Sequence, residues 1–498
     1  MSFCVNFPLF LIVLSLLFSV ISSVLHKKAA RVLSLVLSGL SAAANFVLFL
    51  YVMKSGENVT YLMGHFPHPW GNELRIGLLE ALFSAAFSLI LFLTLLGGKA
   101  PLLTRVEERK GQFYYCMCDL IQASLLSLVY TNDLFTGYVF IEICTIASCG
   151  ILMIRENGKT ILASVRYMIF SLIGSGLFLL GVILLYDITG HLLMPNLKES
   201  VREIAAGGSY RLPLLASMSL IIIGLSVKSG LCPFHLWMAD TYGAAIPTSS
   251  GILSGLISKG YIFLLIKIIF DVFGTELFYA SGVHNVLYAL GALGIIAGSV
   301  AAMRENNILR MSAYSSAAQI GYIYMGLGLS PVLGMEASLF HILVHAFTKP
   351  PLFLAAGLLS DSMGGAKKFR NLQGAGYVNP AAGAAFSFEA FSMIGLPLTM
   401  GFISKYLFGI AAFESTHHKM IPTLLVLAVS TVLNTLYFAR TILRIYNREI
   451  SPNHGEKVTV RSEKMYLLSA LAFVLLNLFF GTAAKPFIDI LAEGIAHF

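Results

Sequence analysis

The sequence predicts an all-α protein that crosses a membrane about fourteen times. Its 498 residues are 57% hydrophobic and only 12% charged, and the mean hydropathy is +0.81. A soluble domain carries about twice this charged fraction. Apolar runs of about 20 residues, long enough to cross about 30 Å of hydrocarbon as a helix, recur along the whole chain. These spans must be helices, because a helix satisfies its own backbone hydrogen bonds in lipid.

The expected spans follow one another with mostly short connections, which leave no room for a soluble domain. They cover residues 4–25, 32–53, 77–97, 113–130, 134–154, 162–186, 213–238, 246–270, 282–303, 308–329, 333–360, 381–412, 421–446 and 465–493. The longest polar stretches, 54–76, 187–212 and 447–464, are expected to be loops.

The charges of the loops predict the orientation of the chain. The first span has no basic segment before it, and its positive cluster, from His26 to Arg31, follows the apolar run. This order differs from that of a cleaved signal peptide and predicts an uncleaved helix with its N-terminus outside. Roughly 21 of the 33 Lys and Arg residues then fall in cytoplasmic loops and about 8 outside. The net charge of +8 therefore reflects topology and does not indicate nucleic-acid binding.

The sequence shows no motif for a cofactor or a metal. Its six cysteines have neither CxxC nor Cys/His metal spacing, and most lie in apolar spans, where cysteine acts as a small hydrophobic filler. There is no haem, flavin, iron–sulfur or nucleotide motif. We therefore expect no cofactor, no metal and no redox chemistry in this chain itself. The sequence leaves open whether the protein serves an oxidoreductase complex as a subunit without a redox centre.

Two spans contain residues that interrupt helices. In the seventh span, GLSVKSGLCPFHLW places Gly230 just before Pro233, and in the twelfth, SFEAFSMIGLPLTMGFISK places Gly395 and Pro397 at mid-membrane. Such breaks free backbone carbonyls, which is tolerated at membrane depth only inside protein or beside a water-filled cavity. Paired broken helices in the two halves of a chain point to a transport site built from inverted repeats.

Four lysines lie inside long apolar stretches, namely Lys228, Lys259, Lys349 and Lys405. A lysine at the bilayer centre costs roughly 2.5–3.5 kcal/mol before pairing or snorkelling. Glu142, in the fifth span, is the natural partner of Lys228. The pair either locks two helices together or controls the protonation state of the lysine. A nearby carboxylate favours the charged form of a lysine, and burial without a partner favours the neutral form. A lysine that alternates between these surroundings can load and release a proton.

The eleventh span adds a stripe of titratable groups. His341, His345 and Lys349 follow at i, i+4 and i+8, so successive members lie about 6 Å apart on one helix face. Histidine titrates nearest neutrality, which suits a proton shuttle, although a lone membrane histidine is more often a hydrogen-bonding core residue. The tenth span has a polar face that either holds water or joins helices. This face consists of Ser312, Ser315, Ser316, Gln319 and Tyr322.

Four further residues are candidates for a gate or for support of the lysines. These residues are Glu80, His235, Asp240 and Glu389. Glu80 lies one turn into the third span, where we expect an interfacial position. His235 and Asp240 lie around the break that follows Lys228.

With these residues the chain resembles a known family over nearly its whole length. The resemblance is sharpest in residues 224–263, 305–326, 341–357 and 395–407. These blocks are similar to the proton-conducting antiporter-like subunits of respiratory complex I, membrane-bound hydrogenases and Mrp-type Na+/H+ antiporters, in which the D-type subunit is the counterpart. The stretch GYVFIEICTIAS resembles the Mrp and hydrogenase branch more than the quinone reductases.

The resemblance implies a fold of fourteen helices with two inverted five-helix repeats and broken helices 7 and 12. It divides the chain into a three-helix segment (1–112), a first repeat (113–270), a second repeat (282–446) and a C-terminal helix (464–498). The chain departs from the family pattern where Pro350 and Pro351 follow Lys349, and a kink is expected there.

The resemblance also assigns roles to residues. It implies a polar axis along the membrane midplane that relays protons, formed by Glu142, Lys228, Lys259, His345, Lys349 and Lys405, and we add His341 to this set. Protons would load the Lys228/Lys259 centre under the control of Glu142, pass His345 and Lys349, and leave near Lys405.

The expected function is that of a proton-translocating subunit in a multi-subunit cation-pumping complex of a bacterial or archaeal inner membrane, with both termini outside. Its partners would be other membrane subunits, with protons or Na+ as the transported ions and no nucleic acid. Two alternatives are a free-standing secondary transporter of a small solute and a structural scaffold subunit whose buried charges only fix helix packing.

Overall fold

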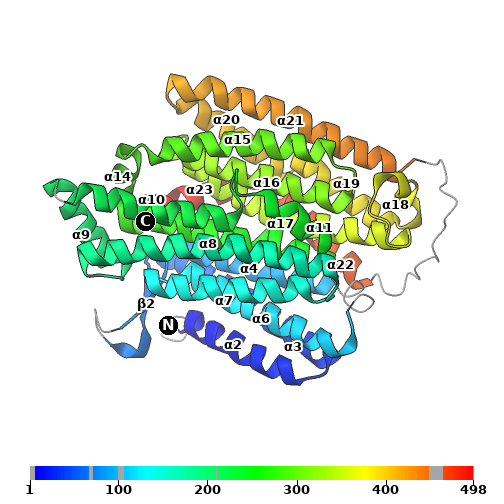
Figure 1. The fold of residues 1–498 in the computed structure, drawn as a ribbon, viewed down its shortest axis with the longest axis horizontal. Coiled ribbons are helices and arrows are strands. Elements are labelled where there is room, and N and C mark those ends of the chain that lie inside the picture. Colours follow the sequence, from blue (N-terminus) through cyan, green and yellow to red (C-terminus); the bar gives the residue numbers. More distant parts are fainter. Residues whose placement is uncertain (1–5, 67–70, 99–105, 209, 448–463, 497–498) are drawn as a thin grey trace.

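The computed structural model describes residues 6–66, 71–98, 106–208, 210–447 and 464–496. Most of these residues lie in helices that pack side by side along the long axis of the molecule (Figure 1). Twelve helices in this part of the chain are long and apolar enough to cross a membrane. The predicted class, an all-α polytopic membrane protein, is confirmed.

The N-terminal part consists of three long helices and a β-hairpin. The helices are α2 (Phe7–Val24), α3 (Lys27–Ser55) and α4 (Leu78–Gly97). Between α3 and α4 lie β1 (Val59–Leu62), the short 3-10 helix η1 (Met63–His65) and β2 (Glu73–Ile76). The strands pair antiparallel, so the prediction of a loop at 54–76 is wrong in this part. Four-residue strands whose burial does not alternate give no period-two signal in a sequence.

The next group of helices contains the first break. It comprises α6 (Glu108–Tyr130), α7 (Leu134–Met153), α8 (Gly158–Thr189), α9 (Met194–Gly207), α10 (Arg211–Ser229) and α11 (Leu236–Ala244). Helix α9 corrects the prediction of a loop at 187–212. It buries only Met194, Leu197 and Val201, a narrow apolar stripe. A search for span-length apolar runs does not detect such a helix.

The eighth span is entirely buried and twice passes through π-helical geometry. It runs through α12 (Pro247–Ile252), η2 (Leu253–Ile257), α13 (Ser258–Ile268), η3 (Ile269–Phe273) and α14 (Gly274–Ala280). The segments η2 and η3 are π-helices, a geometry that occurs frequently at functional sites.

The last group contains the second break. It comprises α15 (Val283–Arg304), α16 (Ile308–Leu327), α17 (Leu333–Ser362), the 3-10 helix η4 (Phe369–Asn371), α18 (Ala375–Val378), α19 (Pro380–Ile394), α20 (Met400–Glu414), α21 (His417–Ile445), α22 (Lys464–Thr482) and α23 (Ala484–Ala496). The predicted last span, 465–493, is wrong in its extent, because α22 ends at Thr482 and α23 is a separate short helix.

Both predicted breaks are confirmed, and both end a half-helix in the same way. Gly230 caps α10 with φ 83° and Gly395 caps α19 with φ 93°, a left-handed conformation that glycine adopts without strain. The N–H of the next residue then bonds back five positions, from Leu231 to Ser226 O (3.0 Å) and from Leu396 to Phe391 O (3.1 Å). The chain resumes as a helix at α11 and at α20.

Helix α17 continues without interruption through Pro350 and Pro351. Pro350 packs against two glycines of the eighth span. A Cβ added at Gly255 would lie 2.5 Å from Pro350 Cγ, and one at Gly251 would lie 3.1 Å from Pro350 Cα. The two glycines therefore leave the space that the proline ring occupies, and they bring α17 close to the eighth span at the level of Lys349.

Candidate functional site

Three of the four predicted intramembrane lysines lie fully inside the protein. Lys228, Lys259 and Lys349 are at most 1% exposed. Lys405 is partly buried, and its Nζ donates hydrogen bonds to Ile394 O (2.5 Å) and Thr431 Oγ1 (3.0 Å). The ammonium groups are therefore held by hydrogen bonds to protein atoms.

Lys228 lies where α7, α8 and α10 meet. Its Nζ is 3.8 Å from Glu142 Oε1, as the sequence predicts, and it donates hydrogen bonds to Thr145 Oγ1 (2.9 Å) and Ser171 O (3.0 Å). The ammonium group lies over the ring of Tyr261, at 5.5 Å from its centroid. At 3.8 Å the carboxylate is an electrostatic partner of Lys228 without a direct hydrogen bond, so Glu142 can move without breaking the bonds that fix the lysine.

Lys259 depends on the π-helical segment η2. Its Nζ donates to Ser254 O (2.5 Å) and to Ser258 Oγ (3.0 Å), both on its own span. Ser254 lies five positions before Lys259, in the turn that the π geometry widens. Among the described residues no carboxylate lies within ion-pair distance of Lys259.

The stripe on α17 contacts serines of α16 and α20. His341 Nδ1 and Ser404 Oγ on α20 lie 2.7 Å apart, and Lys349 donates to Ser315 Oγ on α16 (2.8 Å). Both ring nitrogens of His345 have no hydrogen-bond partner in the described part of the chain, although the residue is fully buried. Buried polar atoms of this kind are usually bonded to ordered water.

The polar face of α16 contacts these groups. Ser316 Oγ lies 2.8 Å from Ser254 Oγ beside Lys259, and Ser315 accepts from Lys349 while Tyr437 OH on α21 lies 3.0 Å away. Several buried polar atoms around this face lack a partner among the described residues. These atoms are Gln319 Nε2, Tyr322 OH, His341 Nε2, both His345 nitrogens and Asn434 Nδ2. The arrangement therefore suits a short chain of waters between α16, α17 and α21.

Glu80 lies in the first turn of α4, where its Oε2 accepts from Gly77 N (3.0 Å). Its side chain is buried, and its Oε1 lies 3.1 Å from Nζ of the equally buried Lys267. Beside this pair, Arg75 of the hairpin lies 2.8 Å from Asp271. Lys267, Asp271 and Arg75 are absent from the sequence-based candidates. Lys267 follows Lys259 by eight residues in an otherwise apolar run, so its isolated charge is the signal that could have identified it.

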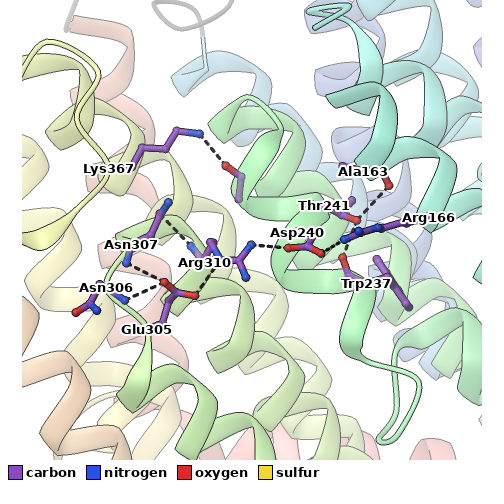
Figure 2. Close-up of polar contacts among 11 residues, drawn as sticks. Ala163, Arg166, Trp237, Asp240, Thr241, Glu305, Asn306, Asn307, Arg310 and Lys367 are labelled. Atoms are coloured by element: carbon purple, nitrogen blue, oxygen red, sulfur yellow. Dashed lines mark hydrogen bonds and ion pairs between the residues drawn. The ribbon is translucent and has the colours of Figure 1, made fainter. Parts of the chain in front are cut away.

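The three other candidates lie in different surroundings. Asp240 on α11 forms ion pairs with Arg166 and Arg310, at the end of the bundle shown in Figure 2. Glu389 on α19 is fully buried and accepts from Asn477 Nδ2 (3.3 Å), while its Oε1 has no partner in the part of the chain that the structure describes. His235, at the start of α11, is also buried. The same part of the chain contains no group of three or more His, Cys, Asp or Glu residues that could hold a metal.

Comparison with known proteins identifies the family. The model of the family described as "NADH:quinone oxidoreductase/Mrp antiporter, TM" matches residues 131–433. The N subunit of the NADH-quinone oxidoreductase of Desulforudis audaxviator is 33% identical over 409 residues, which cover 81% of this chain and 78% of the relative. The D subunit of the Na(+)/H(+) antiporter of Bacillus subtilis is 25% identical over 495 residues, which cover 98% of this chain and 97% of the relative.

Solved structures match the whole fold. A chain of the membrane-bound sulfane sulfur reductase, an archaeal respiratory membrane complex, superposes with a TM-score of 0.87 at 25% identity, covering 98% of this chain and 97% of that chain. A chain of the Mrp complex from a Dietzia species gives the same TM-score at 22% identity, covering 100% and 98%, which shows the shared fold alone. From its sequence match and its broken helices, the chain belongs to the NADH:quinone oxidoreductase/Mrp antiporter transmembrane family.

Proposed function

We propose that the protein is a proton-translocating subunit of a multi-subunit cation-pumping complex in a prokaryotic inner membrane. The observation that carries the proposal is the series of buried and partly buried titratable side chains on α7, α10, the eighth span, α17 and α20, which comprises Glu142, Lys228, Lys259, His341, His345, Lys349 and Lys405. The relatives support it, since they are named as subunits of an oxidoreductase and of an antiporter. The energy source and the other membrane subunits lie outside this chain.

In this proposal Lys228 is the first of the lysines to take up the proton. Glu142 favours its charged form at 3.8 Å, and withdrawal of the carboxylate favours release of the proton. His345 and Lys349 lie about one turn apart on α17, so the histidine would pass the proton to Lys349. His341 Nδ1 lies 2.7 Å from Ser404 Oγ, next in the chain to Lys405, which would release the proton. Serine hydroxyls on α16 and bound waters would complete the path.

The loop charges favour outside positions for both termini, which we include in the proposal. The proposal includes both types of complex, the oxidoreductase and the antiporter, because both occur among the relatives. The relative with the higher identity belongs to an oxidoreductase, while the relative from the antiporter is covered more completely.

Proton flux into vesicles that contain the purified complex tests the proposal. Lys405→Met removes the charge at nearly constant length, and we expect it to abolish pumping while the complex still assembles. Lys54→Met, at an exposed lysine near the end of α3, is the matched control. Normal pumping by Lys405→Met would refute the relay. Failure of the complex to assemble with this variant alone would favour the scaffold role.

A further inference from the structure

A large basic cavity lies apart from the buried lysines, where α8, α11 and α16 meet. It has a volume of about 980 Å³ and is bounded by the start of α8, the end of α11, the start of α16 and the turn after α17. These segments belong to the end of the bundle that also carries α18, opposite to α9 and β2 (Figure 1). The loop charges predict this end to be cytoplasmic.

The lining of the cavity has an excess of positive charge. Five of its residues are basic, Arg155, Lys159, Arg166, Arg310 and Lys367, and the one acidic residue is Asp240, which gives a net charge of +4 (five minus one). In Figure 2 Asp240 lies between Arg166 and Arg310 and pairs with both. Glu305 outside the lining bonds to Nε of Arg310 (2.9 Å).

Two of the basic side chains are uncompensated. Arg155 and Lys159, at the turn between α7 and α8, form no ion pair or side-chain hydrogen bond with any described residue. Lys367 donates to Gly243 O (2.7 Å) on α11. Like charges that converge on one cavity repel each other unless an anion lies between them.

The N-terminal ends of two helices add to the positive electrostatic potential of the cavity. The N-caps of α8 and α16, Asn157 and Asn307, both line the cavity. Asn157 Oδ1 accepts from Thr160 N (3.0 Å) and Asn307 Oδ1 from Leu309 N (3.0 Å), so the caps are formed and the positive ends of both helices point to this place. The helix ends strengthen a site whose charge comes from the side chains.

We propose that this cavity binds the phosphate of an acidic phospholipid head group. Arginine forks and lysines are the groups that bind phosphate. The cavity also borders the outer surface of α8, where Leu162, one of its lining residues, is 53% exposed and Ile161 and Val165 are each 41% exposed. A lipid whose acyl chains follow this surface brings its head group to the basic wall. Basic pockets between helices on the cytoplasmic side bind such head groups.

The site would connect lipid binding to the first helix break. Asp240 lies on α11, the half-helix that resumes after Gly230, and it shares Arg166 and Arg310 with the proposed phosphate. Binding attracts the two arginines toward the phosphate and weakens their ion pairs with Asp240 on α11. Lipid binding itself does not depend on the proposed proton transfer, so a bound-lipid measurement tests it separately.

Titration of the intact, delipidated complex with lipid, read by native mass spectrometry, tests the site. We expect phosphatidylglycerol to bind more tightly than phosphatidylcholine. Arg155→Gln combined with Lys159→Gln should weaken this binding roughly 30-fold, because each basic residue at a membrane surface contributes about fivefold. Lys198→Gln with Arg202→Gln, an exposed pair on α9 with the same loss of charge, is the control and should bind as the wild type does.

Three outcomes decide the proposal. Unchanged phosphatidylglycerol binding by the Arg155→Gln/Lys159→Gln variant overturns it, and restored binding by Arg155→Lys with Lys159→Arg supports it, since that variant keeps both charges. A parallel titration with inorganic phosphate distinguishes the source of the ligand. If inorganic phosphate competes at concentrations equal to those of the lipid, the assignment to a phospholipid is overturned.

Discussion

Lys228, in the first half of the molecule, lies 3.8 Å from the carboxylate of Glu142, whereas the partners of Lys405, in the second half, are a carbonyl and a hydroxyl among the residues that the structure describes. The same contrast separates two further lysines. Lys267 lies 3.1 Å from Glu80, while Lys349 donates to Ser315 Oγ and Ser312 O. Carboxylates thus accompany Lys228 and Lys267 in the first half, with Lys259 as the exception, whereas no described carboxylate lies within ion-pair distance of Lys349 or Lys405 in the second half.

The helix breaks explain how the second half manages without a carboxylate. Lys405 reaches back to Ile394 O, the last residue of α19, where unpaired carbonyls carry a partial negative charge. Lys228 lies in the last turn of α10 and has the same advantage in addition to Glu142. A helix end is fixed, but a side-chain carboxylate can move. The comparison therefore indicates that the charge on Lys228 depends on a carboxylate that can move. The charge on Lys405 is instead stabilised by the fixed carbonyl dipoles at the end of α19.

Arginine at position 405 should produce the largest change in proton flux. Lys405→Arg keeps the positive charge beside Ile394 O, but a guanidinium does not release its proton at physiological pH. We expect flux in vesicles to fall at least about 100-fold, the usual scale for loss of a proton-transferring group. Lys54→Arg is the control at an exposed site. Normal flux would show that position 405 needs a charge and no exchangeable proton.

The next largest effect is expected on the free energy of unfolding, when the buried pair of Glu80 and Lys267 loses one partner. Lys267→Met leaves Glu80 buried without its cation, which costs about 3–5 kcal/mol. Lys349→Met leaves no carboxylate behind and should cost less. Thermal unfolding of the purified complex compares the two variants. Adding Glu80→Gln to Lys267→Met should recover much of the loss, and equal unfolding temperatures for the two single variants would contradict the difference between the halves.

The sequence predicted those parts of the molecule whose signal is local. Gly230 and Gly395 mark the breaks, because a left-handed cap requires glycine, and an isolated lysine in an apolar run stands out wherever it points. The pair of Glu142 with Lys228 was also predictable, since an acid inside a span requires a cation. Each of these signals is confined to one helix or to two residues of opposite charge.

Other features depend on several segments at once, and the sequence did not predict them. The cluster of Glu80 with Lys267 needs the hairpin, α4 and α13 to converge, and the pairing of Asp240 with two arginines joins three helices. The π-helix before Lys259 has no composition that distinguishes it from an α-helix. Such features follow from packing, which hydropathy does not specify.

Removal of the charge on Glu142 should have a moderate effect. Its side chain is 23% exposed and lies 3.8 Å from Lys228, so the interaction amounts to about 1 kcal/mol, or roughly fivefold in rate. Glu142→Gln keeps the shape and should lower proton flux by this factor. In a double-mutant cycle with Lys228→Met, the two changes should be less than additive, because they remove one interaction. Strict additivity would indicate that Glu142 acts on a different group.

A matched pair of threonines provides the finest test of the comparison. Thr145 accepts from Lys228 at 2.9 Å and Thr431 accepts from Lys405 at 3.0 Å, so threonine to valine removes one similar hydrogen bond in each half. After the change Lys228 keeps Glu142 and the bond to Ser171 O, whereas Lys405 keeps the bond to Ile394 O as its one partner among the described residues. We expect Thr431→Val to lower proton flux roughly threefold and Thr145→Val by less than about twofold, given the usual net value of one hydrogen bond. The opposite order would show that Glu142 does not compensate for the lost bond, and that the two lysines depend on their hydroxyl partners alike.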